Sequence, residues 1–342
     1  TPLYSSAASD VYKRQYHILM MTRRELKAVR KRLERFLGDL TMMMGRSERG
    51  RWGSVYIRGL LLDSPRRKTA AGMAHCMEDA DEQSLQQMVS ASPWDHEAVR
   101  KALAIRMSQE LFPRPGWIID DTGFPKQGKH SVGVARQYSG TLGKVGNCQV
   151  AVSLHFSTDE ASVALDFALY LPEEWTLDPE RMQAAKVPKE LVFKEKWRLA
   201  LDLIDRALVW EVPKGVVSAD AAYGDVTEFR EELASRNLYY MLQVSSSLKG
   251  WSKPVKPRLR KASSGRGRPP SRYDYSDAPE PMTVKEVANS LPALAWKTVH
   301  WREGTRGKMG SRFAATRFRP SHGYTQGAHP QPEQWLIIEW PK

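Results

Sequence analysis

Two short apolar runs, far apart in the chain, both end in an aspartate, and they constrain the fold more than any other feature. The first covers residues 116–123 with Asp120 near its end, and the second covers residues 215–220. Each is long enough for a buried strand and too short for a typical helix. Two more strands are expected at 148–157 and 161–171, joined by a hairpin turn.

Helical and strand patterns alternate through the centre of the chain. Residues 178–210 carry apolar side chains, Leu191 among them, at helical spacing, with a break expected near Pro188. A helix is expected at 225–236 and a strand at 238–244. The order of strands and helices predicts a mixed α/β or α+β fold, in which helices pack on a mixed sheet.

The N-terminal part shows helical patterns only. Residues 21–44 repeat apolar side chains every three or four positions, and Thr22 with Glu25 forms a capping-box pattern. The outer face of this helix is basic and could lie along a DNA backbone, although an ordinary solvated face has the same pattern. Its candidate DNA contacts are Arg23, Lys27, Arg30 and Lys31. Further helices are expected at 53–62, 66–78, 81–91 and 94–111.

The charge balance favours a polyanionic partner. The chain has 52 Lys and Arg against 39 Asp and Glu, a net charge of +13, which is typical of nucleic-acid binding but also occurs in merely basic proteins. The excess lies in the two ends, around a slightly acidic middle. Residues 245–275 predict a flexible basic segment, and strands are expected at 294–302, 311–318 and 334–340. The segment's candidate DNA contacts are Arg258, Arg260, Lys261, Arg266 and Arg268, the last two in an AT-hook-like sequence that suits a narrow minor groove.

The two strand-end acids indicate metal chemistry. Sheets of this kind bind ligands beyond the carboxyl ends of their strands, where Asp120, Asp121 and Asp220 are expected. Gathered carboxylates repel one another unless a cation joins them, and Mg²⁺ prefers oxygen ligands. Paired ions can stabilise both oxygens of a phosphodiester displacement. The alternative is that each aspartate caps a helix or shapes a turn.

The residues around these acids resemble a known family. WIIDDTGFPK at 117–126, continued to residue 138, resembles the first catalytic block of DDE-type insertion-sequence transposases, and VSADAAYGD at 217–225 resembles the second. The resemblance covers about residues 21–342. It implies an RNase H-like catalytic core, Mg²⁺ (or Mn²⁺) as cofactor, and cleavage and strand transfer at transposon ends.

The family pattern assigns roles residue by residue. Asp120 matches the first catalytic acid, because the pattern is Asp, any residue, then Thr or Ser, here Thr122; Asp121 stays an alternative metal ligand. Asp220 matches the second acid, and Asp225 is expected to cap the following helix. A Gly- and Lys-rich loop is expected at 125–146. Its cations Lys126, Lys129 and Arg136 could neutralise phosphates, or simply be solvated.

The family's third acid, a Glu on a helix after a β-rich insertion, has no evident match. Glu339 falls in an expected strand, so the acid is expected beyond Lys342, and the chain as printed is expected to be a fragment that binds metal poorly and cuts inefficiently. Residues 1–19 are expected to be a non-native or disordered extension. The expected domains are a helical DNA-binding domain at 20–112, an RNase H-like core at 113–244 and a basic, β-rich insertion at 245–342.

These expectations together predict a DNA transposase that acts on double-stranded DNA, namely terminal inverted repeats and target DNA, with a homodimer plausible. The alternative is a non-catalytic DNA-binding remnant or regulator with the same fold. Two cysteines exclude a disulfide scaffold. The sequence has no apolar run of about 18 residues that would span a membrane. The expected location is therefore the bacterial cytoplasm, in association with the nucleoid.

Overall fold

The computed structural model describes residues 21–64, 67–111, 115–159, 161–260, 271–304 and 307–340. The residue 1–19 extension and the candidate contacts Lys261, Arg266 and Arg268 lie outside these ranges. Within them, no helix is both long and apolar enough to cross a membrane. The chain divides into two compact units. One holds the chain up to Ser218 together with Arg236–Tyr240, and the other holds Ala219–Ser235 and Met241–Lys342.

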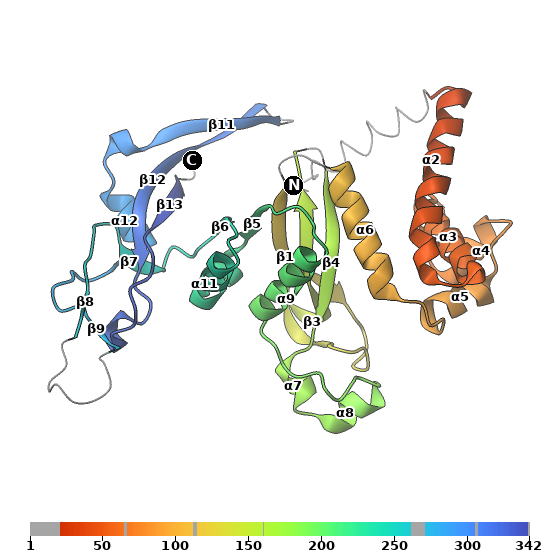
Figure 1. Cartoon of the computed structure of the whole chain (residues 1–342), viewed down its shortest axis with the longest axis horizontal. Helices are drawn as coiled ribbons and strands as arrows, with labels where there is room; N and C mark the ends of the chain where they lie inside the picture. Colours follow the sequence, from red (N-terminus) through yellow and green to blue (C-terminus); the bar gives the residue numbers. More distant parts are fainter. Residues whose placement is uncertain are drawn as a thin grey trace. The chain divides into compact units, whose positions relative to one another are not determined.

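The N-terminal segment is helical, as predicted. Thr22 caps the first helix in the predicted box: its backbone N–H donates to Glu25 Oε2 (2.7 Å), and Glu25 N–H donates to Thr22 Oγ1 (3.3 Å). Only the C-terminal part of this helix is buried, so Leu26 and Val29 stay exposed instead of packing. The helices are α2 (Arg23–Thr41), α3 (Ser47–Leu61), α4 (Ala70–Cys76), α5 (Glu82–Ser90) and α6 (His96–Glu110), with a 3₁₀ turn at Met42–Met44 (Figure 1).

A mixed sheet follows, which confirms the predicted fold class. Its order is β2-β3-β1-β5-β6, with β4 also paired to β3; β1 is antiparallel to β3 and parallel to β5. The strands are β1 (Gly116–Pro125), β2 (Ala135–Ser139), β3 (Lys144–Ser157), β4 (Ser162–Tyr170), β5 (Val216–Ala219) and β6 (Tyr240–Leu242).

The prediction of a loop at 125–146 is wrong in part, because β2 and the start of β3 form a hairpin there. Ala135 lies opposite Cys148 and Ser139 opposite Lys144. Ala135, Cys148 and Ser139 are all buried, so this hairpin extends the core. The turn uses Gly143 at a φ of 63°, a left-handed conformation that glycine adopts without strain.

One face of the sheet is covered and the other is open along β1. Trp117 and Ile119 are buried with Phe156 and Leu154 opposite them on β3. Helix α9 (Lys196–Val209) packs on β3 and β4 with a buried stripe that includes Leu203 and Ile204. Because side chains alternate along a strand, Ile118, Asp120 and Thr122 belong to the other face, and all three are exposed.

The expected helix at 178–210 is broken more widely than Pro188 alone predicts. Short helices α7 (Glu173–Thr176) and α8 (Pro179–Ala184) precede a non-helical stretch that lasts until α9 begins. Lys186 adopts a left-handed φ of 55° within it. Leu191, expected in the apolar stripe, is therefore half exposed.

The second unit contains α10 (Ala221–Gly224), α11 (Thr227–Ser235) and a β-rich part. Three long strands confirm the predicted ones: β11 (Lys297–Gly304), β12 (Gly307–Pro320) and β13 (Gln334–Trp340), so Glu339 does lie in a strand. The sheet order is β10-β7-β12-β11, with β13 paired to β12; β7 is Lys249–Trp251 and β10 is Met282–Thr283. A separate pair joins β8 (Arg258–Leu259) to β9 (Tyr273–Asp274).

The expectation that 245–275 is wholly flexible is wrong for β7. Trp251 in this strand is 4% exposed, and its indole N–H donates to the Pro279 carbonyl (2.7 Å). Helix α12 (Val284–Ser290) was not predicted either. Its Val284 and Val287 pack with Phe318, Leu336 and Ile338 into the core of this unit.

Candidate active site

Asp120 lies inside a strand rather than at its end. Strand β1 continues to Pro125 along β3, whereas its parallel pairing with β5 stops at Ile118. Asp120 is exposed, its Oδ1 accepts from the Asp121 backbone N–H (2.8 Å), and its carbonyl accepts from Ser153 Oγ (3.1 Å). The aspartate therefore projects from a backbone that is hydrogen-bonded on the β3 side.

Asp121 has a different environment, because it belongs to the covered face of β1. Its Oδ2 accepts from Lys196 Nζ at 2.6 Å, at the first residue of α9. Lys196 Nζ also lies 5.3 Å from the centre of the Tyr170 ring. Burial, together with the negative charges of Glu173 and Asp121, raises the pKa of Tyr170. Asp121 is thus engaged in an ion pair that sequence reasoning missed, since its partner lies far along the chain.

Asp220 caps a short helix with one of its two carboxylate oxygens. It directly follows β5, and its Oδ1 accepts from Ala222 N–H (3.0 Å) at the start of α10. Asp225, expected to cap the next helix, instead accepts from the Ser245 backbone N–H (2.8 Å). The described hydrogen bonds occupy one carboxylate oxygen of Asp120 and one of Asp220. Across the described ranges, no three His, Cys, Asp or Glu side chains gather into a metal-binding group.

The candidate DNA contacts lie on exposed surfaces. Arg23, Lys27, Arg30 and Lys31 are exposed on α2, where Arg30 pairs with Glu34 (2.9 Å). Arg258 and Arg260 are exposed on and after β8. Lys126 and Lys129 follow β1, and Arg136 projects from β2; all three are exposed.

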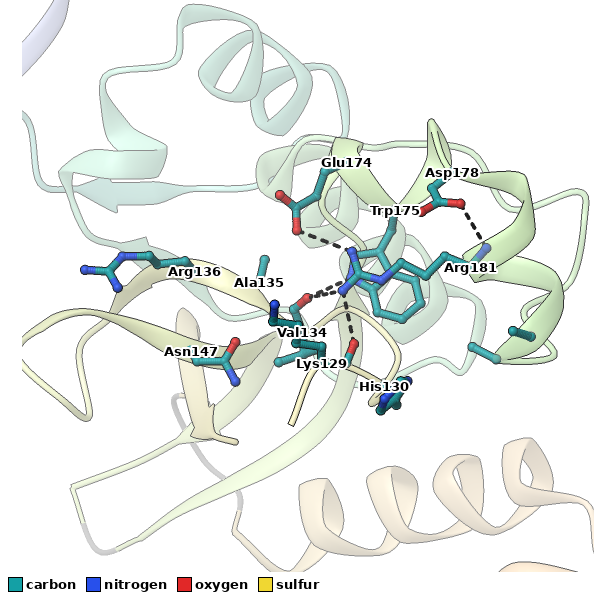
Figure 2. A pocket seen from close by; sticks show the side chains of 12 residues that line it. Lys129, His130, Val134, Ala135, Arg136, Asn147, Glu174, Trp175, Asp178 and Arg181 are labelled. Carbon is teal, nitrogen blue, oxygen red and sulfur yellow. Dashed lines mark hydrogen bonds and ion pairs between the residues drawn. The ribbon is translucent and has the colours of Figure 1, made fainter. Parts of the chain in front are cut away.

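A cavity of about 570 Å³ opens beside the segment that follows β1 (Figure 2). Arg181 of α8 lies 3.8 Å from the centre of the Trp175 ring, and its Nη2 donates to the carbonyls of Lys129 (3.2 Å) and Val134 (3.1 Å). The sequence analysis missed Arg181 and Trp175, because they come from helices more than 40 residues further along the chain. The lining comprises Lys129, His130, Val134, Ala135, Arg136, Asn147, Glu174, Trp175, Asp178, Arg181, Ala184 and Ala185.

The structure thus combines a mixed α/β sheet, with helices on its covered face, and two exposed aspartates, Asp120 on β1 and Asp220 directly after its parallel neighbour β5. The sequence profile of the DDE superfamily endonuclease family matches residues 35–308, which is most of the chain. The chain therefore belongs to this family, and its fold is consistent with an RNase H-like core.

A relative supports the more specific resemblance to insertion-sequence transposases. The chain is 32% identical over 184 residues to the "Probable transposase for insertion sequence element IS701" of Microchaete diplosiphon. The matching region is 53% of this chain and 46% of the relative, so the chain spans about half the relative's length. The resemblance to DDE-type insertion-sequence transposases is confirmed at the level of the family.

Proposed function

We propose that this chain carries the chemistry of a DNA transposase, which cuts transposon ends and joins them to target DNA by Mg²⁺-dependent phosphodiester hydrolysis and strand transfer. Asp120 and Asp220 are the proposed metal ligands. The proposal extends to the helical segment at 20–112 as a DNA-binding domain, the core at 113–244 and the insertion at 245–342. Double-stranded terminal repeats and target DNA are the substrates, and a homodimer would hold two ends together.

The register of β1 and β5 is the observation that favours Asp120 over Asp121 as the first metal ligand. The two strands are parallel neighbours, with Ile118 opposite Ser218. Asp120 follows Ile118 by two residues, and Asp220 follows Ser218 by two residues. Because alternate side chains share a face, this spacing favours Asp120 as the partner of Asp220. Asp121 belongs to the opposite face of β1, and its carboxylate is paired with Lys196.

The donor chemistry of these residues fits a hard divalent cation. Both proposed ligands are exposed carboxylates whose described hydrogen bonds use only one oxygen each. Mg²⁺ is commonly held by one or two carboxylates together with waters and substrate phosphates, so two acids suit it as partial ligands. A bound ion would supply positive charge to the oxygens of the phosphodiester that is cut. The chain's own part is to hold these carboxylates on a rigid strand and at a helix start.

The test is cleavage of a terminal-repeat duplex by Asp120→Asn, Asp220→Asn and Asp121→Asn variants. Loss of a metal ligand removes several kcal/mol of charge stabilisation, so the first two variants should cut at least about 100-fold more slowly and still bind DNA. The Asp121→Asn variant should still cut in a metal-dependent way, because the substitution removes an ion pair with Lys196 and not a proposed metal ligand. Normal cutting by Asp120→Asn, with loss of cutting in Asp121→Asn, would reverse the assignment.

A second candidate is a non-catalytic DNA-binding regulator with the same fold. It is favoured by the finding that the described ranges contain no three-residue group of metal-ligating side chains. With two acids, metal is held weakly and cleavage by this chain is expected to be slow. Titration with Mn²⁺, observed by electron paramagnetic resonance, checks this directly. Duplex binding that is independent of Mg²⁺, with no detectable cutting, would favour the regulator.

A further inference from the structure

We propose that the cavity beside residues 126–136 binds one nucleotide unit of a DNA backbone, its phosphate and sugar, a few nucleotides from the phosphodiester held at Asp120. This inference rests on the proposed function for the identity of the strand. The site would grip the backbone at a fixed distance from the position of chemistry, and it would not read sequence.

The first support is two cationic side chains, with an imidazole beside them, that lack carboxylate partners in the structure as described. Lys129, His130 and Arg136 line the cavity and are exposed. No ion pair joins any of the three to an acid within the described residues. Cations that are held near one another without counter-charges attract an anion, and for a basic chain of this family the abundant anion is a DNA phosphate.

The acids at the cavity cancel this charge only in part, because Glu174 is paired with Arg181 and Asp178 accepts at the start of α8. Glu174 Oε1 lies 3.6 Å from Arg181 Nη1 in an ion pair. Asp178 caps α8 by accepting from the Arg181 backbone N–H (2.9 Å). Figure 2 shows both interactions on the α7–α8 side of the cavity, with Lys129 and Arg136 on the other side. The side toward β2 therefore keeps the unbalanced positive charge.

The aromatic side chain in the cavity favours recognition of charge over stacking on a base. Trp175 is fully buried, its indole N–H donates to the Val134 carbonyl (2.8 Å), and the Arg181 guanidinium lies against its ring. Stacking on a base needs an accessible ring face. The cavity offers cations and polar groups instead, which is the chemistry of a phosphate contact.

The segment that carries the cations is held in place from both sides. Asn147 Nδ2 donates to the carbonyls of Lys126 (2.8 Å) and Gly128 (2.9 Å). Arg181 donates to the carbonyls of Lys129 and Val134 from the opposite side. The backbone is thereby ordered before any ligand arrives, which reduces the entropy cost of binding. Arg181 is accordingly a positioning residue rather than a direct contact.

Strand geometry sets the distance from the proposed site of cleavage. Arg136 lies opposite Asn147, and the adjacent Cys148 lies opposite Pro125 at the end of β1. Five strand residues separate Pro125 from Asp120, which is about 17 Å at about 3.4 Å per residue. One DNA strand advances about 3.4 Å per nucleotide along its helix axis, and its nucleotides are further apart along the curved backbone, so this span corresponds to at most about five nucleotides. The cavity volume of about 570 Å³ exceeds a bare phosphate and suits a small ligand of nucleotide size.

The experiment combines charge-neutral phosphates with charge-removing variants, using the full chain without Mg²⁺. Duplexes carry a single methylphosphonate, moved one position at a time, and binding is measured across salt concentrations. For the wild type, one neutral position, at most about five nucleotides from the nucleotide nearest residue 120, should weaken binding. The Lys129→Ala/Arg136→Ala double variant should lose this sensitivity, and its logarithmic salt slope should fall by about 1 to 2. The matched control Lys214→Ala, an exposed cation just before β5, should behave as wild type.

The position of residue 120 on the DNA is found without relying on catalysis. An iron chelate attached at Asp120→Cys, in a Cys76→Ser background, cleaves the strand nearest to it by hydroxyl radicals. An unchanged salt slope and unchanged methylphosphonate sensitivity in the double variant would overturn the inference, as would a sensitive position adjacent to the chelate. Saturable binding of inorganic phosphate that depends on Lys129 and Arg136, with no effect on the duplex, would assign a free-anion site instead. Because these readouts need no cutting, they can succeed where the proposed catalysis fails.

Discussion

Gly224, the last residue but one of the second sequence block, must be a glycine for a steric reason. A Cβ at this position would overlap the backbone carbonyl of Gln243. The Gly224→Ala substitution must therefore shift backbone, and we expect it to lower the free energy of unfolding by about 2 kcal/mol or more. Urea denaturation measures this. Gly140→Ala is the control, because its added Cβ would meet no atom within 4 Å. Equal stability of the two variants would contradict the steric account.

Sequence reasoning at the residue scale located the aspartates but could not rank them. Asp120 and Asp121 are neighbours in the chain, and only strand register separates the open face from the face that contains Trp117. The partner of Asp121 is Lys196, which no local pattern connects to it. In the same way, Arg181 and Trp175 reach the cavity from helices that a linear pattern does not relate to residues 126–136. Local sequence patterns do not reveal which residues pair over long distances in the chain.

Helix α12 makes a prediction at the scale of an element. Its capping box joins Thr283 to Glu286: the Thr283 backbone N–H donates to Glu286 Oε2 (2.7 Å), and Glu286 N–H donates to Thr283 Oγ1 (3.2 Å). The hydrogen bonds from the Thr283 backbone and hydroxyl lower the pKa of Glu286 from its usual 4.5. A carboxylate with a lowered pKa stabilises the fold above its unfolded-state pKa, and this stability is lost as pH falls through the folded-state pKa.

Thermal melting of the wild type and of Glu286→Gln at a series of pH values tests whether the Glu286 charge stabilises the fold. The wild type should melt at the higher temperature near neutral pH, and the difference should close as the pH falls below 4.5. Glu339→Gln, which changes an exposed side chain of β13, should follow the wild type throughout. A gap between wild type and Glu286→Gln that stays constant down to strongly acidic pH would show that the box does not act through its charge.

At the same scale, elements with strong periodicity were predictable and others were not. The capping box of α2, the β3–β4 hairpin and the three long strands of the second unit follow from alternation and helical spacing. Strand β2 did not, because Gly and Lys around it are typical of loops, and only its pairing with β3 makes it a strand. The stretch before α9 is non-helical over a wider range than one proline requires.

At the scale of the whole molecule, a buried carboxylate ties distant parts of the first unit together. Asp166 on β4 is 1% exposed and accepts from Arg100 Nη1 of α6 (2.6 Å) and Arg206 Nε of α9 (2.7 Å). Removing one partner of a buried ion pair costs about 3–5 kcal/mol. Because both arginines remain partly exposed, we expect Asp166→Asn to lose about 3 kcal/mol, measured by chemical denaturation.

The matched control is Asp202→Asn, which breaks the exposed ion pair between Asp202 and Lys194 (2.6 Å). Surface pairs contribute about 0–1 kcal/mol, so this variant should be nearly as stable as the wild type. A loss of stability in Asp166→Asn no larger than in the control would mean that the arginines do not depend on this carboxylate.

The division of the chain has a consequence for how the protein can be taken apart. The backbone passes between the two units three times, after Ser218, Ser235 and Tyr240. A single protease cut therefore cannot release the second unit as one continuous piece, and its N-terminal segment would stay attached to the first. Neither unit can be expressed alone by shortening the gene from one end. A split into separate halves would require rewiring the order of the segments, as in a circular permutant.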